Sequence, residues 1–257
     1  MIVSPEQDQA AYRVRAEWGP AGAQALATAA YAVVVDVLSF TTTVTVAVER
    51  GMTVWPFRWR DERAAARFAQ ERDAVLAVGR AEARREGAHG VSLSPAEMAR
   101  VEGVERVVLP SPNGSTIAAL LADSGATVVA ASLRNASAVG RWVGDRLRPG
   151  EPVAVVPAGE RWPDGSLRPA VEDLWGAGAV IRGLLSAGVG TDELSPEAWV
   201  AEHAFESEES RIGAWLPACA SGRELVAKGF AADVAVAAEI DLSDVVPVLV
   251  GGAFQRR

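Results

Sequence analysis

The amino-acid sequence predicts an α/β fold in which a mostly parallel sheet carries helices on both of its faces. Short apolar runs rich in valine, such as residues 32–35, are typical of strands that are buried on both faces. Segments of helical length separate these runs, and strands joined by helices form right-handed crossovers in a parallel sheet. An apolar content of 49% is enough for the large core that such a fold requires.

The first half of the chain is predicted to alternate strands and helices. The expected strands are 12–18, 32–35, 53–57 and 74–78, and the expected helices are 21–30, a segment that ends at Gly51, and the charged amphipathic segment 61–72. The polar connection 79–97, which includes His89, is long for a compact domain. It is either a functional flap or loosely ordered surface.

The second half repeats this alternation and then becomes more helical. The expected strands are 106–109, 126–130, 152–156 and a final one at 245–250, and the expected helices are 115–122, 136–147, 171–185, 196–209 and 233–240. Ser221 and Glu224 resemble the capping box of a further short helix. Residues 1–257 are therefore predicted to form one α/β domain that is more helical from about residue 190.

The charge balance argues against several classes of partner. The 257 residues carry a formal net charge of -8 without any block of Lys or Arg, which disfavours nucleic acid and anionic membranes. No apolar run reaches the length of a membrane span, and the first residues lack the pattern of a signal peptide. We expect a cytoplasmic protein that acts on a small molecule, and self-association into a homo-oligomer is left open.

Histidine and cysteine are too rare for several catalytic designs. Cys219 is the single cysteine, so disulfide scaffolds and cysteine-based zinc sites are excluded, and a lone thiol in an apolar helical context is typical of a core residue. His89 and His203 are the two histidines and lie far apart in the sequence. They cannot readily form a Ser-His-Asp catalytic triad or a His-rich metal site. Acid–base chemistry would then depend on carboxylates, a metal ion, or both.

The loops that follow the predicted strands carry hydroxyls, amides and carboxylates. Because such loops lie at the carboxyl edge of a parallel sheet, where open α/β sheets bind ligands, we expect them to form one site. They contain Asp36, Ser39, Thr41, Thr42 and Thr43 in the first loop, Ser111, Asn113, Gly114 and Ser115 in the second, Ser132, Arg134 and Asn135 in the third, and Glu160, Asp164, Glu172 and Asp173 in the fourth.

Asp36 is the best single candidate for a metal ligand or a catalytic carboxylate. It follows a buried strand directly, and the chain then turns into a helix whose free N–H groups favour an anion. The alternative is a solvated acid beside a helix cap. Phosphatases of the haloacid dehalogenase type also place an Asp after their first strand, but they require a second acid two residues later. That position is Leu38 here, so their mechanism is not expected.

The next two loops could bind a phosphoryl group. In the turn Asn113-Gly114-Ser115, glycine lets backbone N–H groups approach an anion, although a plain helix cap by Asn113 or Ser115 explains the turn equally well. Asn135 has the same alternative. Arg134 could clamp a phosphate or sulfonate, whereas the default for an arginine is exposure to solvent.

Glu172 and Asp173 open a predicted helix and are candidate magnesium ligands. Carboxylate oxygens are hard ligands that suit Mg²⁺. Two adjacent acids cannot both face inward from one side of a helix, so at most one is expected to be a direct ligand. The alternative is that both merely offset the dipole at the helix start.

Together, these motifs resemble the ComB family of 2-phosphosulfolactate phosphatases over roughly residues 32–251. The matching segments follow the family order: the Asp-Val-Leu opening at 36–38 with Thr41 and Thr42, the Asn-Gly-Ser turn at 113–115, Ser132 with Asn135 and Ala136, the segment from Ala158 to Asp173, and Ser221 to Leu225. Three positions depart from the family pattern. Ser39 stands where the family carries arginine, Arg80 where it carries glutamate, and Leu93 where it carries asparagine before Ser94 and Pro95.

The resemblance implies a three-layer α/β/α fold and a Mg²⁺-dependent phosphatase that converts 2-phosphosulfolactate to sulfolactate and phosphate, a step on the route to coenzyme M. The implied site has three groups of residues. The metal would be held by Asp36 with Glu172 or Asp173; the substrate by Ser39, Thr41, Thr42, Gly114, Ser115, Ser132 and Arg134; and the catalytic set would be Asp36, Asn113, Asn135, Glu172 and Asp173. The alternatives are a relative that binds a small anion without turnover, or a different small-acid enzyme on this fold, such as a lyase or isomerase.

Overall fold

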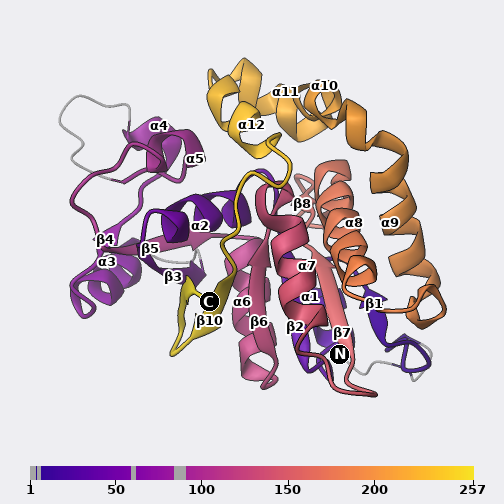
Figure 1. The fold of residues 1–257 in the computed structure, drawn as a ribbon. Helices are drawn as coiled ribbons and strands as arrows, with labels where there is room; N and C mark the ends of the chain where they lie inside the picture. Colours follow the sequence, from indigo (N-terminus) through magenta and orange to yellow (C-terminus); the bar gives the residue numbers. More distant parts are fainter. Residues whose placement is uncertain (1–3, 5–6, 59–61, 84–90) are drawn as a thin grey trace.

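The computed structural model of the chain describes residues 4, 7–58, 62–83 and 91–257. Their core is a sheet of nine strands in the order β1-β7-β2-β6-β10-β11-β3-β5-β4 (Figure 1). The strands are β1 Val14–Ala16, β2 Tyr31–Val35, β3 Thr53–Arg58, β4 Val75–Leu76, β5 Arg106–Ser111, β6 Thr127–Ala131, β7 Val153–Pro157, β10 Pro247–Val250 and β11 Ala253–Arg256. A separate two-stranded hairpin consists of β8 Glu160–Arg161 and β9 Leu167–Arg168.

The sheet consists of two parallel blocks joined by an antiparallel hairpin. β1, β7, β2 and β6 form one block, and β3, β5 and β4 form the other. The hairpin of β10 and β11 pairs antiparallel with β6 on one side and with β3 on the other. The α/β prediction with a mostly parallel, mixed sheet is therefore confirmed.

Because three antiparallel steps separate the blocks, the two blocks run in formally opposite senses. Strand twist of about 20–25° per step rotates β5 by roughly 100–125° relative to β2 across the five steps between them. The carboxyl ends of β2 and β5 can therefore converge, which a flat sheet would not allow. This convergence determines where the site forms.

The alternation of side chains along β2 separates the core into two layers. Val33 and Val35 contribute to one cluster of buried apolar residues, and Ala32 and Val34 contribute to the other. The first layer packs under α7 Ala136–Gly144, α8 Val171–Ser186 and α9 Pro196–Glu208, and the second under α1 Gly19–Ala25, α2 Phe40–Glu49 and α6 Gly114–Asp123. Helices thus cover both faces, as the predicted three-layer arrangement requires.

The remaining helices lie in two regions of the molecule (Figure 1). α10 Ile212–Trp215, α11 Ala220–Ala227 and α12 Ala231–Ala237 follow α9 and arch over the top in Figure 1. α3 Glu62–Gln70, α4 Arg80–Ala83 and α5 Pro95–Met98 lie beside the second block. The polar connection 79–97 contains α4 and the start of α5, whereas its residues 84–90, with His89, are outside the described residues.

Two local predictions in the last third of the chain were wrong. The capping box at Ser221 does not start α11, because the helix already begins at Ala220 and Cys219 Sγ accepts from Gly222 N at 3.3 Å. The final strand does not end the fold, because β11 follows it. Gly251 and Gly252 adopt φ of 59° and 84°, and a Gly-Gly pair with positive φ at both positions is a strong hairpin signal.

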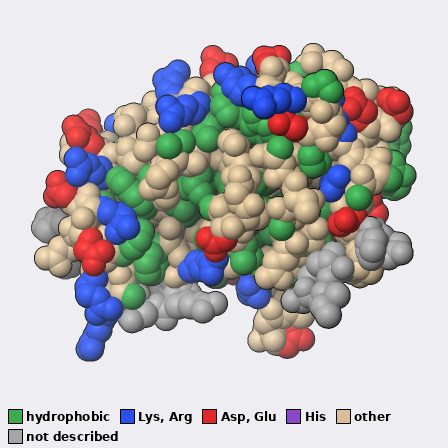
Figure 2. All heavy atoms as spheres, turned by 90° about the horizontal axis from the view of Figure 1, so that it is seen from below, with side chains coloured by type: hydrophobic (Ala, Val, Ile, Leu, Met, Phe, Trp, Pro, Cys, Tyr) green, Lys and Arg blue, Asp and Glu red, His purple; other side chains and the backbone are tan. Residues whose placement is uncertain are grey.

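The surface carries charges of both signs. On the face drawn in Figure 2, Lys and Arg side chains are interspersed with Asp and Glu, and no broad basic area is visible there. Within the described part of the chain, no helix combines the length and the apolar character needed to cross a membrane.

Candidate functional site

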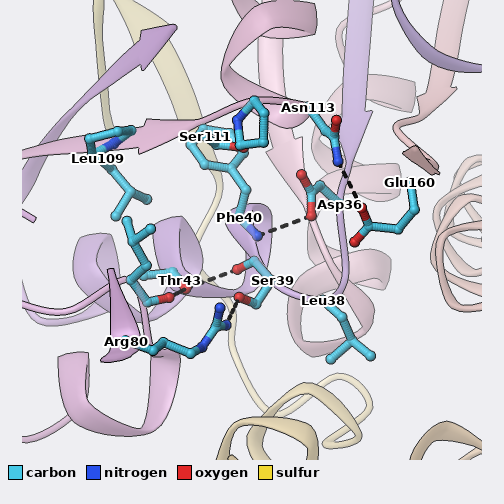
Figure 3. A pocket seen from close by; sticks show the side chains of 13 residues that line it. Asp36, Leu38, Ser39, Phe40, Thr43, Arg80, Leu109, Ser111, Asn113 and Glu160 are labelled. Carbon is cyan, nitrogen blue, oxygen red and sulfur yellow. Dashed lines mark hydrogen bonds between the residues drawn. The ribbon is translucent and has the colours of Figure 1, made fainter. Parts of the chain in front are cut away.

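A cavity of about 180 Å³ opens where the chain leaves β2 and β5 (Figure 3). Its polar lining is Asp36, Ser39, Thr43, Arg80, Ser111, Asn113 and Glu160, and its apolar lining is Leu38, Phe40, Leu93, Leu109, Pro110 and Pro112. Figure 3 shows Asp36, Asn113 and Glu160 at one end, Arg80 at the other, and Ser39 between them. The cavity is smaller than the 300–1,000 Å³ typical of sites for drug-sized ligands, so it suits a small molecule.

Asp36 is held rigidly at the end of β2. Its Oδ1 accepts from the backbone N–H of Phe40 at 3.1 Å, at the start of α2, and its Oδ2 accepts from Gly114 N at 3.0 Å. The Thr41 hydroxyl donates to the backbone carbonyl of Asp36 at 2.8 Å. With only 8% of the residue exposed, the carboxylate can present an edge to the cavity but cannot swing away from it.

Gly114 allows this close approach between the two loops. A Cβ on this residue would lie 2.8 Å from Asp36 Oδ2 and would overlap the ring of Phe40. Beside it, Asn113 Nδ2 donates to Glu160 Oε2 at 3.1 Å. The loops after β2, β5 and β7 therefore meet through Asp36, Asn113 and Glu160, and the predicted turn at Asn113 and Gly114 does contact the predicted carboxylate.

The two acids that line the cavity are held in an environment that disfavours their charge. Burial raises the pKa of Asp36 to about 6, although the N–H groups of Phe40 and Gly114 lower it in part. Burial, followed by the charges of Asp36 and Glu172, raises the pKa of Glu160 to about 7. This end of the cavity would therefore gain stability from a cation or a proton.

Glu172 and Asp173 lie behind the cavity rather than in its lining. Both are almost fully buried at the start of α8. Asp173 accepts from Val37 N at 2.7 Å and from Gly159 N at 2.8 Å, so it links the loops after β2 and β7. Burial raises the pKa of Asp173 well above its usual range. Glu172 Oε2 accepts from Cys219 Sγ at 3.4 Å.

Three of the predicted substrate-binding residues use their polar atoms within the fold. The hydroxyls of Thr41, Thr42 and Ser115 donate to backbone carbonyls, and all three residues are fully buried. Ser39 does line the cavity, as predicted, and Thr43 lines it beside Ser39. Helical threonines often donate to the carbonyl four or five residues earlier, a local option that the sequence pattern did not reveal.

The third loop does not contribute to the lining of this cavity. Asn135 Oδ1 accepts from Ser132 N at 2.9 Å, and its Nδ2 donates to Val245 O at 2.9 Å. Arg134 is paired with Glu49 at 3.2 Å and with Glu239. Asn135 thus makes the cap contacts that its alternative describes. Arg134 is buried with 6% of the residue exposed, so it is not the solvent-exposed arginine that its alternative describes.

Glu160 and Arg80 also line the cavity. Glu160 was expected in the fourth loop of the site but without a catalytic, metal or substrate role, and Arg80 was not among the candidate site residues. Glu160 begins β8, directly after the loop that follows β7. Its place after a predicted strand was the feature of the sequence that indicated a position at the site. Arg80 Nη2 donates to Ser39 Oγ, and Arg80 Nε pairs with Asp233 Oδ2 at 2.6 Å. Two of the three positions that depart from the family pattern, Ser39 and Arg80, are therefore in direct contact.

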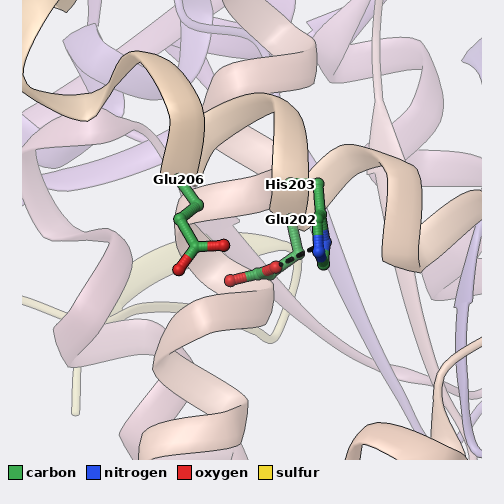
Figure 4. A group of neighbouring side chains, drawn as sticks. All are labelled: Glu202, His203 and Glu206. Carbon is green, nitrogen blue, oxygen red and sulfur yellow. Dashed lines mark ion pairs between the residues drawn. The ribbon is translucent and has the colours of Figure 1, made fainter.

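A second acidic cluster lies on α9, away from this cavity's lining. Ligand atoms of Glu202, His203 and Glu206 lie within 4.8 Å of one another (Figure 4). Arg182 donates to Glu202 and to Glu206 at 3.1 Å each, and His203 Nδ1 lies 3.0 Å from Glu202. Ion pairing with Arg182 accounts for this cluster without a metal.

A small cavity at the strand ends of an α/β sheet, lined by buried acids with raised pKa values, is typical of a small-molecule binding or active site. Comparison with known proteins gives a consistent result. A profile of the 2-phosphosulpholactate phosphatase family matches residues 20–252. Two relatives named probable 2-phosphosulfolactate phosphatase, from Thermotoga petrophila and Thermotoga maritima, are 30% and 28% identical over 226 residues, 87% of this chain and 90% of theirs.

The chain belongs to the 2-phosphosulfolactate phosphatase family. Its class is accordingly that of a phosphoric monoester hydrolase.

Proposed function

We propose that this chain is a Mg²⁺-dependent phosphatase that hydrolyses 2-phosphosulfolactate, or a similar small anionic phosphomonoester, in the cytoplasm. With 2-phosphosulfolactate the products would be sulfolactate and phosphate, and the step would serve a route to coenzyme M, as the family resemblance implies. The observation that carries the proposal is the pair of acids, Asp36 and Glu160, that face a cavity small enough for such a substrate.

The donor set fits Mg²⁺. This ion keeps several waters and is commonly held by one or two carboxylates together with substrate phosphate. Asp36 and Glu160 supply two carboxylates at one end of the cavity. Their pKa values are raised mainly by burial and also by neighbouring carboxylates, which Arg80 and Arg168 only partly offset. We propose these two as the ligands, with Glu172 behind them and Asp173 holding the loops.

Bound Mg²⁺ would neutralise charge on the phosphoryl oxygens and lower the pKa of a coordinated water. The chain's own groups would do the positioning. The fixed Asp36 keeps its carboxylate at the acid end of the cavity, where it would hold the cation, and the Asn113 amide, which already donates to Glu160, holds that acid in place. In the reaction, the water oxygen forms a bond to phosphorus, the ester P–O bond breaks, and a proton passes to the departing hydroxy-acid oxygen.

A phosphate-release assay tests this proposal directly. Purified protein should release phosphate from 2-phosphosulfolactate when Mg²⁺ is present, and EDTA should abolish the release. Phosphorus NMR would identify the product and separate hydrolysis from isomerisation or elimination. Absence of turnover on 2-phosphosulfolactate and on a panel of small phosphomonoesters would reject the proposed activity.

A further inference from the structure

We propose that Arg80 binds a second anionic group of the substrate, a carboxylate or a sulfonate, and that Asp233 and Ser94 hold its guanidinium in position. The inference rests on the proposed function, because it assigns the far end of the same cavity. It makes Arg80 the residue that selects phosphate esters of small organic acids over plain alkyl phosphates.

The charges along the cavity are separated. Asp36 and Glu160 lie at one end, and Arg80 lies at the other (Figure 3). Among the described residues, Arg80 is the one Lys or Arg in the lining. If the phosphoryl group lies at the acid end together with a cation, the rest of a small substrate extends along the cavity toward Arg80. There the guanidinium complements the charge of a second anionic group.

The guanidinium is held by a buried acid from the C-terminal part of the chain. Arg80 Nε pairs with Asp233 Oδ2 at 2.6 Å, and the Asp233 side chain is only 2% exposed. Asp233 Oδ1 accepts from the Ser94 hydroxyl and from Ala96 N at 3.3 Å. Both carboxylate oxygens are thereby engaged, so Asp233 fixes the orientation of Arg80 but does not itself line the cavity.

Arg80 keeps donors for a ligand after these contacts. Its Nη2 donates to Ser39 Oγ, which places the guanidinium at the cavity wall. Its Nη1 has no hydrogen-bond partner among the residues that the structure describes. Its side chain is 18% exposed, which is enough for a ligand to reach it. A planar guanidinium with free N–H groups matches the spaced oxygens of a carboxylate or sulfonate.

Binding of two non-hydrolysable phosphonates tests the inference without requiring turnover. 2-Methyl-3-phosphonopropanoate carries the second anion, and isobutylphosphonate replaces that carboxylate with a methyl group. Calorimetry with Mg²⁺ present should show that the wild-type protein binds the first compound about 10- to 100-fold more tightly, the range expected for a charge-assisted hydrogen bond in a partly buried site.

Substitutions then assign this preference to Arg80. Arg80→Ala should abolish it while changing the affinity for isobutylphosphonate less than about twofold, and Arg80→Lys should retain part of it because the charge remains. Asp233→Asn should reduce the preference, and Asp233→Glu should restore part of it, with melting curves to establish that each variant is folded. Arg182→Ala, which removes an ion-paired arginine from α8, is the matched control and should leave the preference intact.

Three outcomes would overturn the inference: no preference in the wild-type protein, an equal loss for both phosphonates in Arg80→Ala, or an unchanged preference in that variant. Phosphate release is measured separately. A protein that binds the phosphonates with the expected preference but releases no phosphate would contradict the proposed function and support the role of Arg80.

Discussion

The backbone N–H of Gly114 donates to Asp36 Oδ2 at 3.0 Å, although 78 residues separate the two in the chain. Asp36 follows β2 and Gly114 begins α6 after β5, so this bond joins the two parallel blocks of the sheet across the C-terminal hairpin. The same bond fixes Oδ2 of Asp36, the carboxylate that lines the cavity. One hydrogen bond therefore contributes both to the packing of the two blocks and to the geometry of the site.

Gly114→Ala should therefore impair both stability and activity. The added Cβ would lie 2.8 Å from Asp36 Oδ2 and overlap the Phe40 ring, so the loops must separate. Overpacking of this kind costs about 1–3 kcal/mol. We expect a lower melting temperature and at least a tenfold lower kcat. Gly213→Ala is the control, because its Cβ would meet no atom within 4 Å; equal effects of both substitutions would contradict the argument.

Asp36→Asn should lower kcat/KM by about 100-fold or more, because a ligand to the proposed Mg²⁺ loses its charge. The amide also directs an NH₂ group at one of the two backbone N–H donors, Phe40 or Gly114. Steady-state phosphate release measures the loss. Asp164→Asn removes an exposed acid that accepts from the backbone and hydroxyl of Ser166 and should retain wild-type activity. An Asp36→Asn protein with full activity would remove Asp36 from the mechanism.

In metal-free buffer, folding stability should fall as pH rises from about 4 to about 7. Asp36 and Glu160 have folded-state pKa values of about 6 and about 7, raised mainly by burial. An acid whose pKa is higher in the folded protein than in the unfolded chain binds more protons in the folded state. The free energy of unfolding therefore decreases as the pH rises, until the pH passes the folded-state pKa.

Melting temperatures in EDTA at pH 5 and pH 8 measure this decrease. The double variant Asp36→Asn, Glu160→Gln should show a smaller difference between the two pH values than the wild-type protein. Mg²⁺ added at pH 8 should raise the wild-type melting temperature, since a ligand of the folded state stabilises it. A wild-type protein whose stability is unchanged, or rises, over this pH range contradicts the electrostatic description of the cavity.

The sequence predicted most of the fold because β-α units leave strong local signals. Residues 32–35 are uniformly apolar, and the turn at Asn113 and Gly114 marks the start of α6, so both elements could be placed. The antiparallel hairpin between the two blocks could not be placed, because strand order is decided by packing between distant segments. Its Gly251-Gly252 turn was a readable local signal.

The site was predicted in part, for a related reason. Asp36, Ser39 and Asn113 do line one cavity, whereas Asn135 caps its own loop and Arg134 pairs with Glu49. Sequence shows which polar residues follow strands, but not whether their atoms are already used by backbone groups nearby. Arg80 illustrates the converse case, since its position depends on Asp233, 153 residues later.

Cys219 should have no part in the chemistry, although it lies against Glu172. Burial, followed by the charge of Glu172, raises the pKa of the thiol to about 12, so it is protonated at neutral pH and a poor nucleophile. Its sulfur accepts from Gly222 N at the start of α11. Cys219→Ser keeps an acceptor at this helix cap, whereas Cys219→Ala removes it at a cost of about 1 kcal/mol.

We expect Cys219→Ser to hydrolyse substrate within twofold of wild type, and the native thiol to react far more slowly with a disulfide reagent than the denatured one. A phosphorylated cysteine trapped during turnover, or a folded Cys219→Ser protein without activity, would show instead that the thiol attacks the phosphoryl group.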